Sequence, residues 1–178
     1  MKRIKVTVEG TAPILFNRFT EDSGGGRAKK KYEDKDEAEK RVYRMSTGKK
    51  NLYIPSIYFY KSMINASSFY KIGRKSVSTI LAGTIRIEPE QIDLKTNKYI
   101  MDKQPVVIQT SRIMRVRPRL DKWKVSFEIV YNEKYFNKTD MLKDILVEAG
   151  ERIGIGDSRP QKKMFYGTFE VTEFKEVN

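Results

Sequence analysis

The 178-residue sequence predicts an α+β fold, in the order strand, helix, strand, strand or hairpin, helix, strand, which is βαββαβ. Two observations predict it. Apolar and polar residues alternate in segments near the start, in the middle and at the end of the chain, as in strands with one buried face. Between them lie two segments whose apolar residues recur every three or four positions, as on one face of a helix. No internal repeat or second core is visible, so we expect one domain over residues 1–178.

The first strand is predicted at the N-terminus of the chain. Ile4, Val6 and Val8 alternate with polar residues, which indicates one buried face and one face in water. Gly10 ends this strand.

Residues 11–53 form a predicted insertion after the first strand, comparable to a thumb that projects from the core. Three consecutive glycines at 24–26 predict a mobile loop, because glycine has the largest backbone freedom to lose on ordering. Alternating charges predict a solvated helix over 31–44. A basic insertion could grip a strand of nucleic acid or a neighbouring subunit; the alternative is an ordinary charged loop.

The first core helix is predicted over residues 56–70, after an extended segment at 52–55. Pro55 stands where a helix can begin, since proline suits the first turn. The helix carries a wide apolar face suited to packing on a sheet. The residues of this face are Ile57, Phe59, Tyr60, Met63, Ile64, Ala66 and Tyr70.

Three further strands are predicted before the second helix. One covers residues 84–88 and stops at Pro89. Two more, at 106–116 and 123–131, are joined through a turn-like segment at 117–121, which predicts that they pair as a hairpin.

A second helix and a last strand complete the predicted fold. The helix is capped by Thr139 or Asp140, runs to Ala149 and ends at Gly150. The last strand covers residues 168–174. This order of elements is that of a ferredoxin-like sheet, the RRM-like arrangement found in many RNA-binding domains.

The charge balance of the chain predicts a polyanionic partner. Lys and Arg number 36 against 23 Asp and Glu, so the formal net charge is +13. An excess of this size attracts nucleic acid. The alternative is a basic surface that serves solubility only.

The chain contains neither cysteine nor histidine, and these two absences exclude whole classes of chemistry. Without cysteine there are no disulfides, thiol nucleophiles or zinc ribbons. Without histidine there can be no histidine-dependent ribonuclease, no triad that contains histidine and no histidine-ligated metal. We expect no cofactor. No apolar run approaches the length of a membrane span, so we expect a cytoplasmic protein with no membrane contact.

A line of arginines is the first candidate for nucleic-acid binding. Alternate residues of a strand share one face at a spacing of about 6.6 Å, close to the spacing of phosphates along a strand. Guanidinium groups bind phosphate with two hydrogen bonds. The candidates are Arg112, Arg115, Arg117 and Arg119, with Pro118 expected to interrupt the strand. The alternative is the solvated outer face of a hairpin.

A glycine-containing basic loop is the second candidate. It follows a helix and precedes a strand, so it is neither a dinucleotide fingerprint nor the phosphate loop of an ATPase, which need the order strand, loop, helix. Glycines allow a backbone to come close to a ligand, and cations supply charge. The alternative is a tight turn whose glycines have positive φ angles. The candidates are Gly154, Gly156, Arg159, Lys162 and Lys163.

Basic residues elsewhere complete the predicted interface. Those of the insertion would close over a bound strand, and Lys61 belongs to the first helix. The insertion supplies Arg18, Lys29, Lys30 and Lys31. Of the many aromatic residues, most are expected in the core, and one or two are expected to stack on bases.

Two of these segments resemble a known superfamily. Residues 53–63 (YIPSIYFYKSM) resemble the strand-to-helix region of the repeat-associated mysterious proteins, the RNA-binding backbone and processing subunits of CRISPR effector complexes. The loop with Gly154 and Gly156 resembles their glycine-rich loop, although it lacks further glycines, and the chain is small for a backbone subunit. The sequence also looks similar to short phage-encoded proteins that share the elements at 115–123 and 154–160.

This resemblance implies a ferredoxin-like palm, a thumb near residues 20–50 and head-to-tail oligomers along RNA. The expected function is non-catalytic binding of single-stranded nucleic acid, RNA in preference to DNA, as a homo-oligomer or as a subunit of a larger ribonucleoprotein. One alternative is a metal-dependent endoribonuclease, because some backbone subunits of the resembled family cut RNA with one loop aspartate; Asp22 is the candidate here. Another is a phage-encoded decoy that binds a host defence complex.

Overall fold

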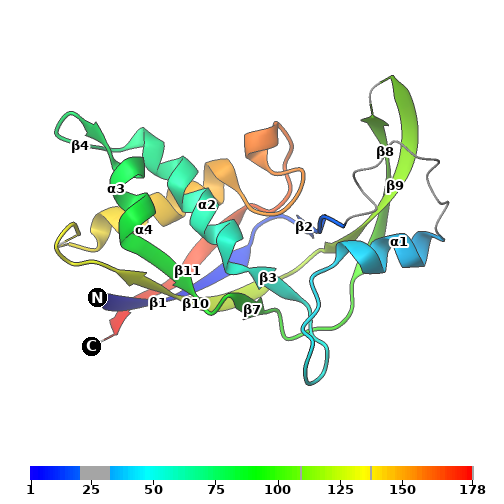
Figure 1. Ribbon diagram of the computed structural model, residues 1–178, viewed down its shortest axis with the longest axis horizontal. Helices are drawn as coiled ribbons and strands as arrows, with labels where there is room; N and C mark the ends of the chain where they lie inside the picture. The colour runs from blue at the N-terminus through cyan, green and yellow to red at the C-terminus, as the bar shows by residue number, and fades with distance from the viewer. Residues whose placement is uncertain (21–32, 109, 137, 178) are drawn as a thin grey trace.

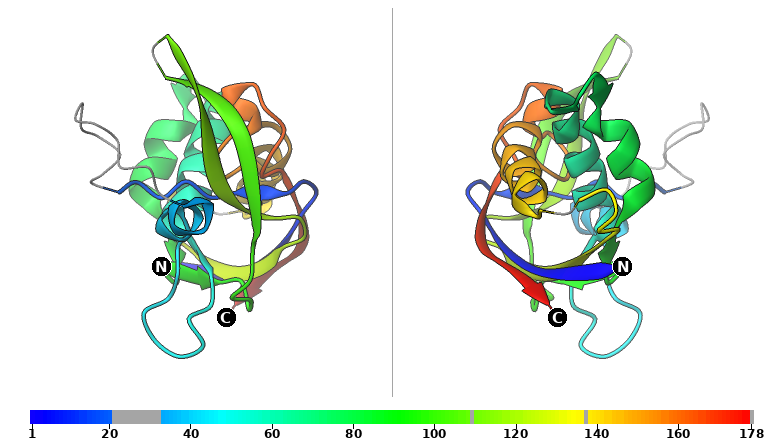
Figure 2. Two further views of the ribbon diagram at one scale, coloured as in Figure 1. Left: turned by 90° about the vertical axis from the view of Figure 1, so that its right-hand side faces the viewer. Right: turned by 90° about the vertical axis from the view of Figure 1, so that its left-hand side faces the viewer.

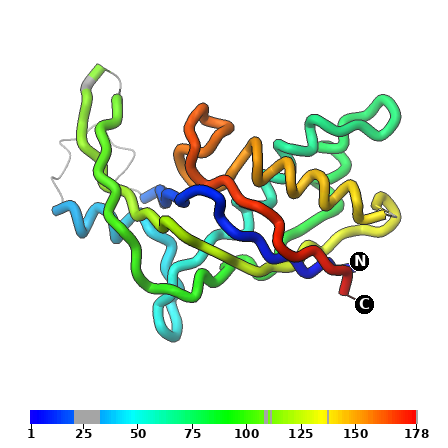
Figure 3. Tube along the Cα trace, turned by 180° about the vertical axis from the view of Figure 1, so that it is seen from behind, coloured from blue at the N-terminus to red at the C-terminus, as the bar shows by residue number. Residues whose placement is uncertain are grey.

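The main sheet of the computed structural model contains four strands, all paired antiparallel. The structure describes residues 1–20, 33–108, 110–136 and 138–177. Strand β1 (Lys2–Gly10) lies at the centre, between β11 (Phe169–Val177) and β10 (Lys124–Tyr131), and β6 (Ile85–Glu88) forms the far edge (Figure 3). The chain ends therefore lie close together on neighbouring strands.

The alternating residues of β1 create the buried face that the sequence predicted. Ile4, Val6 and Val8 are fully buried and face helices α2 (Ser56–Ala66) and α4 (Asp140–Glu148), which cover one face of the sheet (Figure 2). Phe59 of α2 packs on Phe127 of β10, with ring centroids 4.5 Å apart. Burial of such side chains contributes about 2–3 kcal/mol each, so this layer is the main source of stability.

The opposite face of the sheet is polar, and several of its charges are paired. Arg3 bridges Glu88, at 2.8 Å, and Glu128 of the neighbouring strand. Thr7 lies within hydrogen-bonding distance of the hydroxyl of Ser126, at 2.9 Å. Arg3 and Thr7 are thus satisfied by contacts with neighbouring strands of this face.

Helix α4 continues beyond the glycine that was expected to end it. The chain passes through a π-helical turn, Ala149–Ile153, and leaves the helix at Gly154, whose φ is +69°. Gly150 has another role. A Cβ atom there would lie 2.1 Å from the carbonyl oxygen of Phe169, so the glycine allows close packing on β11. The first helix is also shorter than predicted, because α2 ends at Ala66 and a 3-10 turn, Ser67–Phe69, follows.

The predicted hairpin between 106–116 and 123–131 is wrong. Strand β9 (Ser111–Leu120) pairs with β8 (Ile100–Ile108) and with the short β2 (Ile14–Leu15), whereas β10 pairs with β1 and β6. Pro118 does not interrupt β9. Its carbonyl accepts the N–H of Phe16 at 2.9 Å, so its missing N–H faces the end of the short β2 and removes no hydrogen bond to β8.

The β8–β9 hairpin projects from the main sheet. Part of the predicted insertion packs against it. Helix α1 (Asp34–Arg41) packs on β9, and both lie at the side of the molecule opposite β4 (Figure 1). Residues 11–16 do not project: Ile14, Leu15 and Phe16 are fully buried. The glycines at 24–26 lie outside the described residues.

Several short elements have no counterpart in the sequence analysis. They are β7 (Gln91–Asp93), which pairs with β3 (Tyr53–Pro55) of the predicted extended segment, the hairpin of β4 (Lys71–Ile72) with β5 (Lys75–Ser76), and helix α3 (Val77–Thr84). None of the described helices is long and apolar enough to cross a membrane. The α+β class is confirmed, with helices on antiparallel sheets.

Candidate nucleic-acid interface

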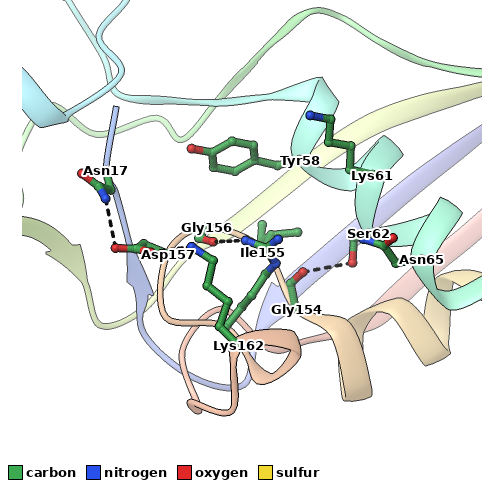
Figure 4. A pocket seen from close by; sticks show the side chains of 11 residues that line it. Asn17, Tyr58, Lys61, Ser62, Asn65, Gly154, Ile155, Gly156, Asp157 and Lys162 are labelled. Atoms are coloured by element: carbon green, nitrogen blue, oxygen red, sulfur yellow. Dashed lines mark hydrogen bonds and ion pairs between the residues drawn. The ribbon is translucent and has the colours of Figure 1, made fainter. Parts of the chain in front are cut away.

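A polar cavity of about 230 Å³ lies between α2 and the glycine-containing loop (Figure 4). Five of the residues that the sequence predicted for nucleic-acid binding line it, although they come from segments about a hundred residues apart. They are Lys61, Gly154, Gly156, Arg159 and Lys162. Asn17, Tyr58 and Asn65 also line the cavity and were not predicted, because uncharged polar residues have no distinctive pattern in a sequence.

Helical spacing places one wall of the cavity. Tyr58, Ser62 and Asn65 are four and three residues apart, so they share a face of α2 with Lys61 beside them. The Ser62 hydroxyl is buried and lies 3.0 Å from the carbonyl oxygen of Gly154 and 3.2 Å from that of Ala149. This contact holds the loop against the helix.

The loop glycines match the alternative of a tight turn with positive φ angles, and approach to a ligand stays a prediction. Gly154 and Gly156 have φ angles of +69° and +77°, which side chains disfavour. A Cβ atom on Gly156 would lie 2.7 Å from the carbonyl oxygen of Leu15. The loop therefore needs glycine at this position to reach β2.

Replacing Gly156 by alanine is expected to destabilise the protein by about 2–3 kcal/mol, because positive φ and a backbone clash act together. Gly73→Ala is the matched control: its φ is +60°, but no atom lies within 4 Å of its Cβ position. We expect a loss of about 1 kcal/mol there. Urea unfolding of both variants measures the difference. Equal losses would contradict the close approach to Leu15.

Asp157 is the acidic centre of the loop. Its carboxylate is buried, pairs with Arg117 at 2.8 Å and Lys162 at 3.2 Å, and accepts a hydrogen bond from Asn17 at 3.2 Å. Burial alone would raise the pKa of this carboxyl, but Arg117 and Lys162 outweigh burial and lower the pKa below its ordinary value. The carboxylate thus ties the loop to β9.

Arg115, Arg117 and Arg119 share one face of β9, and Pro118 does not interrupt this line. Three of them are engaged in ion pairs: Arg115 with Glu37 of α1 (3.1 Å), Arg117 with Asp157, and Arg119 with Asp102 (2.7 Å). The first two pairs hold α1 and the glycine-containing loop to the hairpin, and the third joins its two strands. Arg112, near the hairpin tip, is exposed. Phosphate binding by this line stays a prediction.

Positive charge remains in excess beside the cavity. Arg41 of α1 donates a hydrogen bond to Asn17, and its guanidinium lies 3.5 Å from Glu37. Burial, together with the nearby charges of Arg115 and Arg117, lowers the pKa of Arg41, although Glu37 opposes the shift. Cations crowded in this way favour an incoming anion.

The remaining predicted residues do not gather in the cavity. Arg18 and Lys163 are exposed outside its lining, and Lys163 has a φ of +62°. Lys29, Lys30 and Lys31, and the aspartate at 22, lie outside the described residues. Within the described part of the chain, no group of three carboxylates is placed to hold a metal ion.

One exposed aromatic side chain follows directly after the basic loop. Phe59 is fully buried, whereas Phe165, just after the loop, is 64% exposed and stacks on Tyr166 with ring centroids 4.5 Å apart. Gln104 of β8 donates a hydrogen bond to the hydroxyl of Tyr166 at 3.0 Å. Phe165 thus presents a supported ring beside the basic loop.

The fold and the site define an α+β protein with antiparallel sheets and a basic, polar cleft. No protein-family model matches the chain, and no curated protein matches it in sequence. A solved structure with a similar fold is described as the cryo-EM structure of the Type III-B Cmr-beta bound to cognate target RNA. The similarity has a TM-score of 0.65 at 13% sequence identity and covers 99% of this chain. The chain spans 61% of the length of that neighbour.

Proposed function

We propose that the protein binds single-stranded RNA in the cleft between α2 and residues 154–163, as a non-catalytic subunit of a larger ribonucleoprotein. The observation that carries this proposal is the convergence of Lys61, Arg159 and Lys162 on one polar cavity beside glycine backbone. Cations bind phosphate, and glycines leave room for a backbone of another molecule. The similarity in fold to a protein of the Type III-B Cmr-beta structure, which is bound to target RNA, supports RNA over DNA.

We infer further that the chain is related to the repeat-associated mysterious proteins. The two segments that resemble them, residues 53–63 and the loop at 154–156, face each other across the cleft. The sheet order β11–β1–β10–β6, with α2 and α4 on one face, supports a ferredoxin-like core into which β7, β8 and β9 are inserted. The resemblance of the two segments and the order of the strands are independent observations.

The proposed RNA path avoids the open face of the main sheet. Simple RNA-recognition motifs stack bases on aromatic residues of that face. Here the outer side chains of β1 are polar or charged, and Arg3 and Thr7 are satisfied by neighbouring strands. Phe165, by contrast, offers an exposed ring next to the cleft.

RNA binding is expected to show a strong dependence on salt. On single strands each neutralised phosphate contributes about −0.7 to the slope of the logarithm of the association constant against the logarithm of salt concentration. If the cleft neutralises about three phosphates, this slope should be near −2. Fluorescence anisotropy of nuclease-treated protein, between about 50 and 200 mM salt, measures this slope. A slope near zero, or no binding at the lowest salt, would contradict the proposal.

The same preparation tests the oligomer and the absence of catalysis. Light scattering should give a mass that grows as the strand is lengthened, if several copies bind along it. RNA incubated with Mg²⁺ should be recovered intact. Cleavage that disappears in Asp22→Ala would overturn the non-catalytic role.

A further inference from the structure

The cavity-lining face of α2 continues beyond the cavity toward an exposed aromatic ring. Lys61 and Asn65 line the cavity, and Phe69 follows four residues later on the 3-10 turn. From Ser62 to Phe69 the chain advances about 10 Å, at a rise of about 1.5 Å per residue. The same side of the molecule therefore carries both the cavity and this ring.

One face of the Phe69 ring is covered by a guanidinium group. Arg152, on the π-helical turn that precedes Gly154, lies 4.3 Å from the ring centroid and is held by Glu148 at 2.6 Å. Phe69 is nevertheless 52% exposed. A large aromatic side chain half in water contributes little to the core, whereas a ring backed by a cation is a prepared stacking surface.

The β4–β5 hairpin begins two residues after this ring and is strongly basic. Lys71, Arg74 and Lys75 are exposed and form no ion pair with any residue that the structure describes. The hairpin is well anchored: the N–H of Val77 donates to the carbonyl of Tyr70 at 3.1 Å, and Ser76 caps α3. Two acids, Asp144 and Glu148, lie near Tyr70 at the start of the hairpin. Glu148 is already paired with Arg152.

We propose that Phe69, Arg152 and the β4–β5 hairpin form a second nucleic-acid contact that continues the cleft. One base of a single strand stacks on the free face of Phe69. The adjoining phosphates contact Lys71, Arg74 and Lys75. This inference rests on the proposed function, since the strand that reaches Phe69 leaves the cleft beside Lys61.

The alternative occupant of this surface is a protein. Ile72 at the hairpin is 40% exposed and would suit an apolar contact. The concentration of unpaired cations beside a cation-backed ring favours RNA, because stacking and phosphate neutralisation together are how proteins hold single strands.

Strand length separates the second contact from the cleft. A dinucleotide, whose length is about one phosphate spacing of 6.6 Å, should occupy the cleft alone, and a strand of about 16 nucleotides should reach both sites. We expect Phe69→Ala, and separately Arg74→Glu/Lys75→Glu, to weaken binding of the long strand about tenfold and to leave the short strand unchanged. A fluorescent base analogue near one end of the long strand should lose its stacking signal in Phe69→Ala.

Tyr135→Ala is the matched control for the ring. Tyr135 is 48% exposed and has Lys134 6.0 Å from its centroid, but it lies on the loop between β10 and α4. It should bind both strands like the unaltered protein. Thermal unfolding of each variant checks that the fold is retained.

The outcomes distinguish the two proposals. If Lys61→Glu/Arg159→Glu in the cleft abolishes binding while the Phe69 and hairpin variants bind normally, the second contact is wrong and the proposed function stands. If none of these variants affects binding, the proposed function itself fails. If the hairpin variants keep full RNA affinity but lose association with a protein subunit, the surface is a protein contact and the inference is overturned.

Discussion

Reversing the charge of Lys61 and Arg159 together is expected to weaken RNA binding by about a hundredfold or more. Each hydrogen bond to a charged group contributes about 1.5–3 kcal/mol, and two are lost and replaced by repulsion. Lys61 is exposed, and Arg159 contacts only neutral groups among the described residues, the carbonyl of Gly156 at 3.0 Å and Gln161. The fold should therefore tolerate both changes.

The salt dependence of the same variant gives a second, independent result. Removing two phosphate contacts should make the slope of the binding constant shallower by about 1.4. Lys49→Glu/Lys98→Glu changes the net charge by the same amount at exposed positions outside the cavity lining. If this control lost as much affinity as the cleft variant, general charge attraction would explain the binding and the cleft would not be the site.

Removing the carboxylate of Asp157 is expected to cost about 3–5 kcal/mol of folding stability. The change leaves Arg117 partly buried without its partner, and an uncompensated buried charge is expensive. For a chain of this length the melting temperature should fall by about 10 °C. Asp121→Ala is the control, because Asp121 is about half exposed and pairs with Arg119 at 2.7 Å. Exposed pairs contribute less than about 1 kcal/mol.

The lowered pKa of Asp157 also predicts a dependence on acidity. A carboxyl whose pKa is lower in the folded than in the unfolded state contributes fully above its ordinary pKa, near 3.9, and this contribution is lost as the pH falls through the lower folded value. The stability difference between the unaltered protein and Asp157→Asn should therefore shrink below about pH 4. A difference that stayed constant to the lowest pH would show that the ion pairs of Asp157 do not stabilise the fold.

Local patterns in the sequence correctly predicted the helices and strands that bury one face in the core. The alternation around Ile4 and Val6 predicted β1, and the helical spacing of Leu142, Ile145 and Leu146 predicted α4; all five side chains are buried. Composition excluded cysteine and histidine chemistry without any structure. These conclusions hold because side-chain periodicity and residue type are properties of neighbouring residues.

Only the tertiary structure decided the pairing of β9 and the location of the cleft. Alternation along 111–120 shows which side chains share a face, but not that the partner is β8 rather than β10. The same alternation placed the arginines together, yet Glu37 and Asp157, which pair with Arg115 and Arg117, are distant in sequence. Lys61 and Lys162 line the same cavity because α2 and the loop pack through Ser62 and Gly154. Long-range packing sets which charges remain available to a ligand, and periodicity within one segment carries no information about it.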